Sequence, residues 1–468
     1  MAIFWRGNRS AWFPAPEGGR ESPLKRRVVE QDAQGLRAPL MVAAGLRLGL
    51  LAAVVAHSGS GALSRPDTAS YLTPGRNLLL HGWFATNGVA EIDRTPGYGL
   101  FLALTSLGGP LTVAVVQIGL SILTVALVGR LARTIFGDGR AALVAAWLFA
   151  VEPLSIVYSI LLLSETLFLT LLVASLERLA EFLHGRRLAV LAEAGLWLAA
   201  ATMVRPVTYY LPWALAAGLV VALARVPGLR WKAPAVLLLS TMPWLAGWQI
   251  RNWVETGFGG FSSIQTQNLY FFNAAEVTGR LEGRSLAEVQ NRFGYNDEQL
   301  FVMRHPEAAG WSQAQRLHWM QTEGGRVLRA HPGLFLRLHL AGVLRTTLNP
   351  GAAVFVSLFE AHADEETYLR ERERGALQGM LWVVRTHPWQ MTLMVVLEAW
   401  LLALYLLAMR GMMRADAALR VGQWLLVGVG FYFLAVSGGA VGAARLRLPV
   451  MLAVCILSAS GVARQRVV

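Results

Sequence analysis

Cysteine and acidic residues are scarce in this sequence. The single cysteine among 468 residues, Cys455, excludes an internal disulfide, and its apolar surroundings indicate a packing role. Basic residues outnumber acidic ones by 42 to 29, which gives a net charge of +13. A nucleic-acid-binding protein would gather this charge into one patch, whereas these arginines lie in short turns between apolar runs. The pattern therefore indicates a lipid surface and no nucleic-acid partner.

Several signatures of cofactor and metal chemistry are also missing. There is no phosphate-binding glycine loop, no dinucleotide fingerprint and no HExxH pair, and the nine histidines are dispersed. We therefore expect no cofactor, and a divalent metal has no support in the sequence. No internal repeat is evident, which argues against a secondary transporter built from two related halves.

Long hydrophobic runs are abundant. Hydrophobic residues make up 55% of the chain and charged residues only 15%. Since an apolar helix of about 20 residues crosses a bilayer, we predict an all-α polytopic membrane bundle of about 10 transmembrane helices (roughly 9 to 13). Interfacial helices and a mainly helical region should lie on its outer face. The predicted spanning runs are 38–56, 111–135, 140–158, 162–183, 188–204, 206–225, 233–250, 385–409, 421–437 and 446–463.

The distribution of arginine predicts the orientation of the bundle. Arginine-rich turns fall on one side together with the polar N-terminal leader, and this side should be the cytoplasm. The amphipathic run 331–350 should lie in the interface, because a crossing there would put the arginine-rich 410–420 turn outside. The predicted division is a cytoplasmic basic tail (1–37), a transmembrane module (38–256) with its first outer loop at 57–110, an outer-face loop or cap region (257–384) and C-terminal transmembrane helices (385–468).

Three acidic residues belong to the predicted outer side. Asp67 is either a helix cap or a reactive carboxylate. Asp93, in "EIDRTPGYGLF", either pairs with Arg94 or Arg65 or serves as a second acid. Glu165 opens an apolar run with no basic neighbour, so it is either a carboxylate favoured by the helix dipole or a substrate contact.

Arginines on the predicted outer side run against the usual bias of positive charge towards the cytoplasm. Each one either reaches to lipid headgroups, pairs with an acid, or binds a phosphate, whose oxygens match the planar guanidinium fork. Arg47 lies inside the first apolar run and needs a partner or a cavity there. The outer arginines are Arg65, Arg76, Arg94, Arg205, Arg251, Arg445 and Arg447.

Several segments, taken in order, resemble the C-type (GT-C) integral membrane glycosyltransferases. The resemblance is to the bacterial branch related to protein O-mannosyltransferases and the lipid A aminoarabinose transferase. One departure is the single acid at Asp67, where some relatives carry a pair. The segments are "RPDTASYLTPGRNLL" (65–79), "DRTPGYGLFLAL" (93–104), "TIFGDGRAALVAAWLFAVEP" (134–153), "LLSETLFLTLLV" (162–173), "LAAATMVRP" (198–206), "PWLAGWQIRNWVETG" (243–257) and "ARLRLPVMLA" (444–453).

The resemblance implies that 38–256 is a catalytic module. It would transfer a sugar, with inversion, from a polyprenyl-phosphate donor to a membrane-associated acceptor such as lipid A, another glycolipid, a polysaccharide or a protein. The reaction would occur on the periplasmic face of a bacterial inner membrane. Asp67 would act as base or orient the acceptor, with Asp93 as a second acid. The donor phosphate would be held by Arg205, Arg251, Arg445, Arg65 and Arg94, and substrate contacts would come from Glu165, Tyr71 and Tyr98.

Three other readings stay open. An O-antigen ligase or polymerase also handles lipid-linked sugars, but it would place its decisive residues in a large outer loop late in the chain. A secondary transporter would place acids at mid-membrane depth. A non-catalytic assembly subunit would tolerate loss of Asp67.

Overall fold

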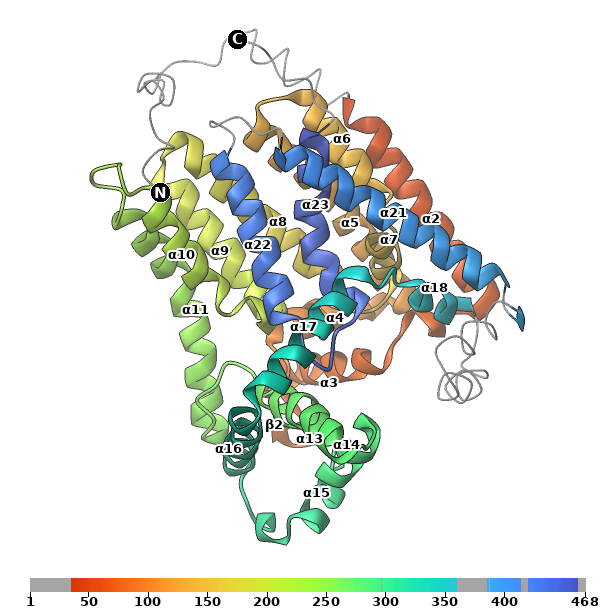
Figure 1. Ribbon diagram of the computed structural model, residues 1–468, viewed down its shortest axis with the longest axis vertical. Helices are drawn as coiled ribbons and strands as arrows, with labels where there is room; N and C mark the ends of the chain where they lie inside the picture. The colour runs from red at the N-terminus through yellow and green to blue at the C-terminus, as the bar shows by residue number, and fades with distance from the viewer. Residues whose placement is uncertain (1–34, 296, 360–384, 387, 414–419, 462–468) are drawn as a thin grey trace.

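Helices form nearly all of the described chain. The computed structural model describes residues 35–295, 297–359, 385–386, 388–413 and 420–461 (Figure 1). These residues contain one small hairpin, in which β1 (Ala85–Thr86) pairs antiparallel with β2 (Val89–Ala90). The turn residues Asn87 and Gly88 have φ angles of 52° and 75°, as such a tight turn requires. The prediction of a helical bundle is confirmed.

The helices of the main bundle occupy the upper part of Figure 1. They are α2 (Arg37–Ser58), α5 (Pro110–Phe136), α6 (Gly139–Ala150), α7 (Pro153–Ile160), α8 (Glu165–Gly185), α9 (Leu188–Val204), α10 (Leu211–Ala222), α11 (Lys232–Thr256), α21 (Pro388–Met413), α22 (Arg420–Val436) and α23 (Leu448–Ser460). Gly137 and Gly257 end α5 and α11 in the left-handed conformation, with φ angles of 66° and 77°.

The predicted spanning run at 140–158 is two helices. α6 and α7 are bent by 57° where they meet. The prediction of one helix there is wrong because Pro153 begins α7 and has no N–H to continue α6, while the Glu152 carboxylate caps the new helix. The buried Arg47 side chain donates to the carbonyl of Ala150 (2.9 Å), which lies in the last turn of α6. The other predicted runs each coincide with one main helix to within a few residues.

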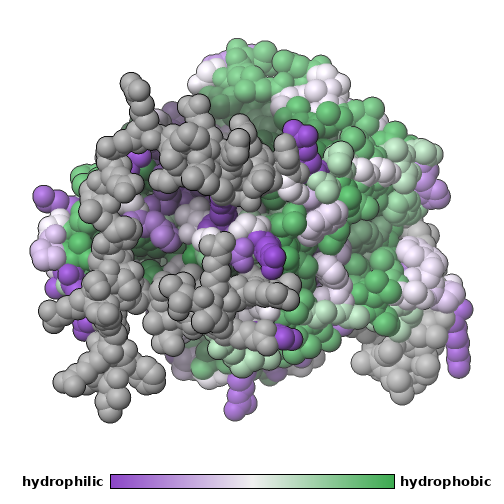
Figure 2. Space-filling model, turned by 90° about the horizontal axis from the view of Figure 1, so that it is seen from above, coloured by the Kyte–Doolittle hydropathy of each residue, from purple (hydrophilic) through white to green (hydrophobic). Residues whose placement is uncertain are grey.

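Several described helices meet the requirements for crossing a membrane. By length and composition, α2, α5 and α21 qualify singly, and α6 with α7 qualifies as a bent pair. α9, α10 and α22 are shorter apolar helices. Figure 2, which views the molecule from above, shows hydrophobic residues over much of the surface that the grey atoms leave visible. A buried apolar core together with many exposed large apolar side chains is typical of a helical membrane bundle.

A layer of short helices closes the lower end of the bundle in Figure 1. α3 (Pro66–His81) and α4 (Pro96–Thr105) cross this end, with α17 (Pro332–Leu348) and α18 (Ala352–Phe359) nearby. Short 3-10 turns complete the connections, at η1 (Ser60–Leu63), η2 (Ser106–Gly108), η3 (Pro206–Thr208), η5 (Pro306–Ala308) and η7 (Ala444–Arg447).

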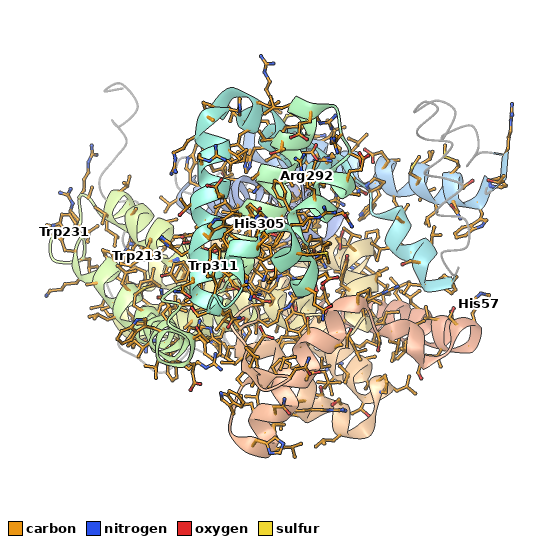
Figure 3. All side chains as sticks on the ribbon, turned by 90° about the horizontal axis from the view of Figure 1, so that it is seen from below. His57, Trp213, Trp231, Arg292, His305 and Trp311 are labelled. Atoms are coloured by element: carbon orange, nitrogen blue, oxygen red, sulfur yellow. The ribbon has the colours of Figure 1, made fainter. Side chains whose placement is uncertain are left out.

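A separate helical unit projects below this layer. It comprises α12 (Ile264–Gln267), the π-helix η4 (Asn268–Ala274), α13 (Ala275–Glu282), α14 (Leu286–Phe293), α15 (Glu298–Arg304) and α16 (Gln313–Ala330). Figure 3, seen from below, shows Arg292, His305 and Trp311 in this unit. Its aromatic core includes Phe271 and Phe301, and Ile92, from the loop between β2 and α4, packs into the same core. The loop before α4 is therefore fixed to the projecting unit.

Two predicted features fall on residues that the structure does not describe. Most of the basic tail at 1–37 lies in 1–34, and the last part of the predicted outer-face region at 257–384 lies in 360–384.

Candidate active site

The first turn of α3 leaves the Asp67 carboxylate available for tertiary contacts. Pro66 begins the helix, and the Thr68 hydroxyl accepts a hydrogen bond from the backbone N–H of Arg65 (2.9 Å). The same hydroxyl donates to the carbonyl of Leu162 (3.0 Å), which fixes the start of α3 against the segment before α8. Arg65 is the N-cap residue and Asp67 lies inside the first turn, so the Asp67 carboxylate is not the helix cap that the sequence allowed.

Two arginines from distant parts of the chain hold Asp67. Arg94 Nη2 lies 3.0 Å from Asp67 Oδ1, and Arg445 Nη1 lies 3.1 Å from Oδ2. Burial alone would raise the pKa of the Asp67 carboxyl, but the two guanidinium groups outweigh it and the pKa lies below its ordinary value. The Asp67 side chain is still 35% exposed, so it stays accessible.

The Arg94 guanidinium is fixed by three side chains at once. Besides Asp67, it donates from Nε to Ser70 Oγ (3.0 Å) and from Nη1 to the Tyr71 hydroxyl (3.1 Å). Its Cζ also lies 4.5 Å from the centroid of the Tyr71 ring. The buried Tyr98 packs edge-on against that ring and donates to Gln117 (2.9 Å). Tyr98 therefore supports Tyr71 from behind.

A second ion pair adjoins the first. Arg205 Nη1 lies 2.5 Å from Glu165 Oε1 and also donates to Ser164 Oγ (3.1 Å). Ser164 Oγ lies 3.4 Å from the Tyr71 hydroxyl, which links the two ion pairs. The other oxygen of the buried Glu165 carboxylate, Oε2, has no hydrogen-bond partner among the described residues. A buried acceptor of this kind calls for a ligand or a water.

Positive charge exceeds negative charge in this cluster. Glu165 and Asp67 raise the pKa of Arg445 above its ordinary value, although burial would lower it. Tyr158 lies within electrostatic reach of Arg445, Arg205 and Arg65, so these three arginines share one neighbourhood. Arg65 itself donates to the carbonyl of Ser357 (3.4 Å). Four guanidinium groups thus surround two carboxylates, which is the balance of a site for an anion.

The structure puts Asp93 and Arg251 beside the cluster rather than in it. The Asp93 carboxylate accepts from Ser263 and from Gln267 Nε2 (2.8 Å). Burial and the nearby Glu91 charge raise the pKa of Asp93 to about 6. Arg251 donates to the carbonyls of Glu91 (2.7 Å) and Phe84 (2.5 Å). Both residues therefore fix the loop that carries Arg94.

Three members of the cluster are not among the residues predicted from the sequence. Ser70, Tyr158 and Ser164 are uncharged, and nothing in their local sequence separates them from other polar residues. Two of them could have been found from their neighbours in the sequence, because Ser70 is next to Tyr71 and Ser164 is next to Glu165, which are both predicted site residues.

Arg447 and Arg47 have structural partners away from the cluster. Arg447 is buried and donates to three backbone carbonyls, those of Thr346, Thr347 and Asn349. Arg47 binds Ser121 and Ser155 as well as backbone carbonyls. In the described part of the chain, no three His, Cys, Asp or Glu side chains gather in a way that could hold a metal ion.

Comparison with known proteins agrees with this architecture. Residues 94–247 match the family model of dolichyl-phosphate-mannose-protein mannosyltransferases, a stretch that includes Arg94, Glu165 and Arg205. The fold matches the archaeal oligosaccharyltransferase AglB from Archaeoglobus fulgidus, solved in complex with an inhibitory peptide and a dolichol-phosphate. That match has a TM-score of 0.51 and 14% identity, and it covers 94% of this chain and 50% of AglB. The chain therefore has the fold of this archaeal enzyme, and about a third of it matches the mannosyltransferase family model.

The other comparisons are weaker. The apo form of the Archaeoglobus fulgidus enzyme gives a TM-score of 0.49 at 15% identity, covering 94% of this chain and 51% of that one. ArnT from Cupriavidus metallidurans gives 0.35 at 13% identity, covering 85% and 73%. No curated protein matches the sequence. The chain spans about half the length of the archaeal enzyme.

Proposed function

We propose that this chain transfers a sugar from a polyprenyl-phosphate donor to a membrane-associated acceptor, on the periplasmic face of a bacterial inner membrane. The observation that carries the proposal is the Asp67 carboxylate held between Arg94 and Arg445, in a cluster with excess positive charge. The dolichol-phosphate bound to the archaeal enzyme of the same fold supports a lipid-phosphate donor.

The donor phosphate is assigned to Arg94, Arg445, Arg205 and Arg65. Their guanidinium groups can bind its oxygens in pairs and stabilise the charge that develops as it leaves. Arg251, the remaining candidate, already donates to two backbone carbonyls, and we assign it to holding the loop.

In the proposed reaction, an acceptor hydroxyl oxygen attacks the anomeric carbon from the face opposite the phosphate. The new C–O bond forms while the bond between that carbon and the phosphate oxygen breaks, so the configuration inverts. The bond's electron pair stays on the polyprenyl phosphate, and Asp67 receives the hydroxyl proton or orients that hydroxyl as its proton is lost.

Binding of the donor would itself prepare Asp67. A carboxylate paired with two arginines is a weak base, because its pKa is low. Phosphate oxygens compete for the same two guanidinium groups. As Arg94 and Arg445 turn to the phosphate, burial of Asp67 is no longer offset and its basicity increases. Asp67 would thus gain basicity when the donor is in place.

The remaining site residues would shape the substrate pocket. The free Oε2 of Glu165 can accept a hydrogen bond from a sugar hydroxyl, and the Tyr71 hydroxyl is near enough to join it. Tyr98 supports the Tyr71 ring. Asp93 acts as the second acid by positioning the backbone that carries Arg94, through Ser263.

The proposal is tested by the Asp67→Asn variant. Envelope glycolipids and glycoproteins of the host would be compared by mass spectrometry in cells with the native chain, with the variant and without the chain. We expect a one-sugar difference between the first and last, and a transfer rate lower by about 10²–10⁴-fold in Asp67→Asn.

Asp138→Asn provides the matched control, since Asp138 caps α6 and Asn caps equally well. It should transfer at the native rate. Native transfer by Asp67→Asn, or no mass difference in either pool with the native chain, contradicts the proposed function.

A further inference from the structure

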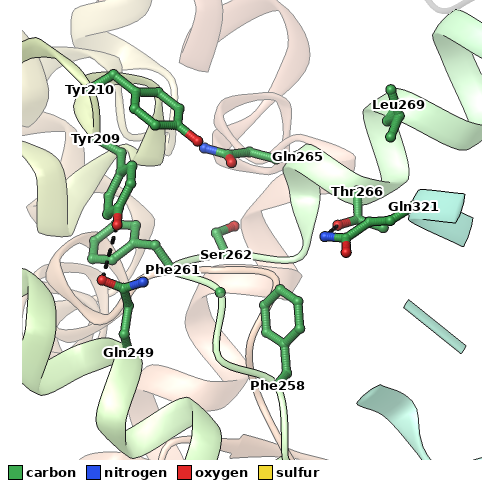
Figure 4. Close-up of a pocket in the computed structure, with 11 residues that line it drawn as sticks. Tyr209, Tyr210, Gln249, Phe258, Phe261, Ser262, Gln265, Thr266, Leu269 and Gln321 are labelled. Carbon is green, nitrogen blue, oxygen red and sulfur yellow. Dashed lines mark hydrogen bonds between the residues drawn. The ribbon is translucent and has the colours of Figure 1, made fainter. Parts of the chain in front are cut away.

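A cavity of about 440 Å³ lies beside the ionic cluster, and none of the roles described above uses it (Figure 4). Tyr209 and Tyr210 form one side of it, and Gln265 and Gln321 lie opposite, from α12 and α16. Phe261 and Phe258 close the side nearest Ser262. The lining therefore alternates aromatic rings with amide and hydroxyl groups.

The chemistry of this lining selects a neutral polyhydroxylated ligand. None of the lining residues is Asp, Glu, Lys or Arg, so the cavity has no counter-charge for a desolvated phosphate or carboxylate. Amide side chains offer both donors and acceptors, which suit hydroxyl groups. Aromatic rings offer flat apolar faces for the C–H side of a sugar ring.

Some of the polar groups are already oriented. The Tyr209 hydroxyl donates to Gln249 Oε1 (3.1 Å), and Gln249 Nε2 donates to the carbonyl of Gly259 (3.2 Å). On the opposite wall, Gln321 Nε2 donates to Thr266 Oγ1 (2.9 Å). Such fixed donors and acceptors lower the entropy lost on binding a ligand.

Two wall residues connect the cavity to the elements that carry the ionic cluster. Ser262, in its wall, donates to the backbone carbonyl of Asp93 (2.6 Å), the residue before Arg94. Tyr209, in the other wall, follows Arg205 by four residues across η3. The wall residue Leu269 belongs to the π-helix η4, a form that is frequent at functional sites. A ligand in this cavity would be adjacent to the proposed phosphate site.

We propose that this cavity binds an uncharged sugar unit of the acceptor, which makes the acceptor a glycan or glycolipid. The inference rests on the proposed function, since calling the ligand an acceptor assumes that the chain transfers a sugar. The arginine cluster already accounts for the donor's phosphate. The inference extends that function by naming the acceptor class and the residues that recognise it.

Binding is tested without turnover. The full chain in lipid nanodiscs is mixed with neutral methyl glycosides of glucose, galactose and mannose, and saturation-transfer NMR detects contact. We expect contact with at least one glycoside, weakened by about three- to tenfold in Tyr210→Ala and in Gln265→Ala. Both side chains are exposed at the cavity, so their loss should leave the fold intact.

Two comparisons sharpen the binding result. Gln299→Ala, at an exposed position on α15 outside the cavity, should bind glycosides as the native chain does. A neutral blocked tripeptide is offered in parallel. Absence of glycoside contact, equal loss in Gln299→Ala, or binding of the tripeptide in place of the glycosides overturns the proposal.

A kinetic arm separates acceptor from donor. Tyr210→Ala and Gln265→Ala should raise the KM for acceptor and leave the KM for donor unchanged, whereas a rise confined to donor KM overturns the acceptor assignment. Glycoside binding is also measured in Asp67→Asn. If Asp67→Asn binds glycoside and transfers sugar at the native rate, the proposed function is contradicted and the cavity proposal is not. If it binds no glycoside and has lost transfer, the cavity proposal is contradicted and the proposed function is not.

Discussion

The ionisation of Asp67 results from two opposed influences. Burial disfavours its charge, while Arg94 and Arg445 favour it and outweigh burial. Removing one arginine therefore lets the pKa of Asp67 rise. In Arg445→Gln, we expect the acidic limb of the kcat/KM profile for transfer to move to higher pH, because Asp67 becomes protonated earlier as pH falls. The measurement is transfer rate against pH in proteoliposomes.

Arg280→Gln is the control for this shift. Arg280 is exposed on α13 and pairs with Glu276 within the same helix, far along the chain from Asp67. Its profile should match that of the native chain. An acidic limb that stays in place in Arg445→Gln would mean that Asp67 does not titrate in the reaction.

The sequence predicts individual site residues but not their partners in space. Resemblance to a family identified Asp67 and Arg445, although 378 positions separate them. Their direct pairing required the fold. The same resemblance implies that Arg251 binds phosphate, whereas in the structure its guanidinium donates to backbone carbonyls. The sequence reveals a charged side chain that is costly to bury, but not the partner that offsets the free-energy cost of its burial.

At the scale of elements, the loop before α4 depends on Asp93. The folded-state pKa of Asp93 is about 6, above the ordinary value of 3.8, so the folded chain binds more protons than the unfolded chain between these values. Stability from this group is therefore greatest at low pH and declines as pH rises through about 4 to 6. We expect Asp93→Asn to lack this decline and to raise the thermal midpoint at pH 7 by roughly 2–5 °C.

Glu91→Gln tests the cause of the Asp93 shift. The Glu91 charge contributes to the raised pKa of Asp93, so its removal should move the decline to lower pH. Thermal midpoints in detergent, recorded from pH 4 to 8, measure both variants. A lower midpoint for Asp93→Asn at pH 7 would show that its hydrogen bonds to Ser263 and Gln267 outweigh the cost of its buried charge.

The close crossing of α3 and α4 depends on glycine. A Cβ atom on Gly75 would lie 2.1 Å from the backbone oxygen of Gly99, which a backbone shift alone could relieve. We expect Gly75→Ala to lower stability by about 1–3 kcal/mol through overpacking, and to reduce transfer by separating Asp67 from Arg94. Thermal midpoint and transfer rate are the measurements.

Gly119→Ala is the matched control within α5. No heavy atom lies within 4 Å of the added Cβ, and alanine favours a helix over glycine by about 0.5–1 kcal/mol. Its stability should be equal or higher. Equal behaviour of the two variants would show that α3 and α4 can separate without cost.

Periodicity and apolar length predicted the positions of the helices but not the break at Pro153. A proline within an apolar run either kinks a helix or begins a new one. The outcome here depends on Glu152, which caps α7, and on the buried Arg47, which belongs to α2. Tertiary partners of this kind are not visible in a local window of sequence.

At the scale of the whole molecule, the distribution of arginine and the fold assign the same segments to each of the two ends of the bundle. Segments predicted to be outside meet in space: Asp67 contacts Arg445, and Asp93 contacts Ser263. The short turn between α10 and α11 joins the opposite ends of those helices. If the arginine bias predicts orientation correctly, the first group faces the periplasm and this turn faces the cytoplasm.

A matched pair of cysteine substitutions tests this orientation. Ala287 is exposed on α14 of the projecting unit, and Ala224 is exposed in the turn between α10 and α11. The only native cysteine, Cys455, is buried, so the unmodified chain should react little with a maleimide that cannot cross membranes. In cells whose outer membrane has been permeabilised, we expect Ala287→Cys to be labelled and Ala224→Cys to be labelled only after lysis. Labelling in the reverse order would put the Asp67 cluster in the cytoplasm, where a periplasmic acceptor could not reach it.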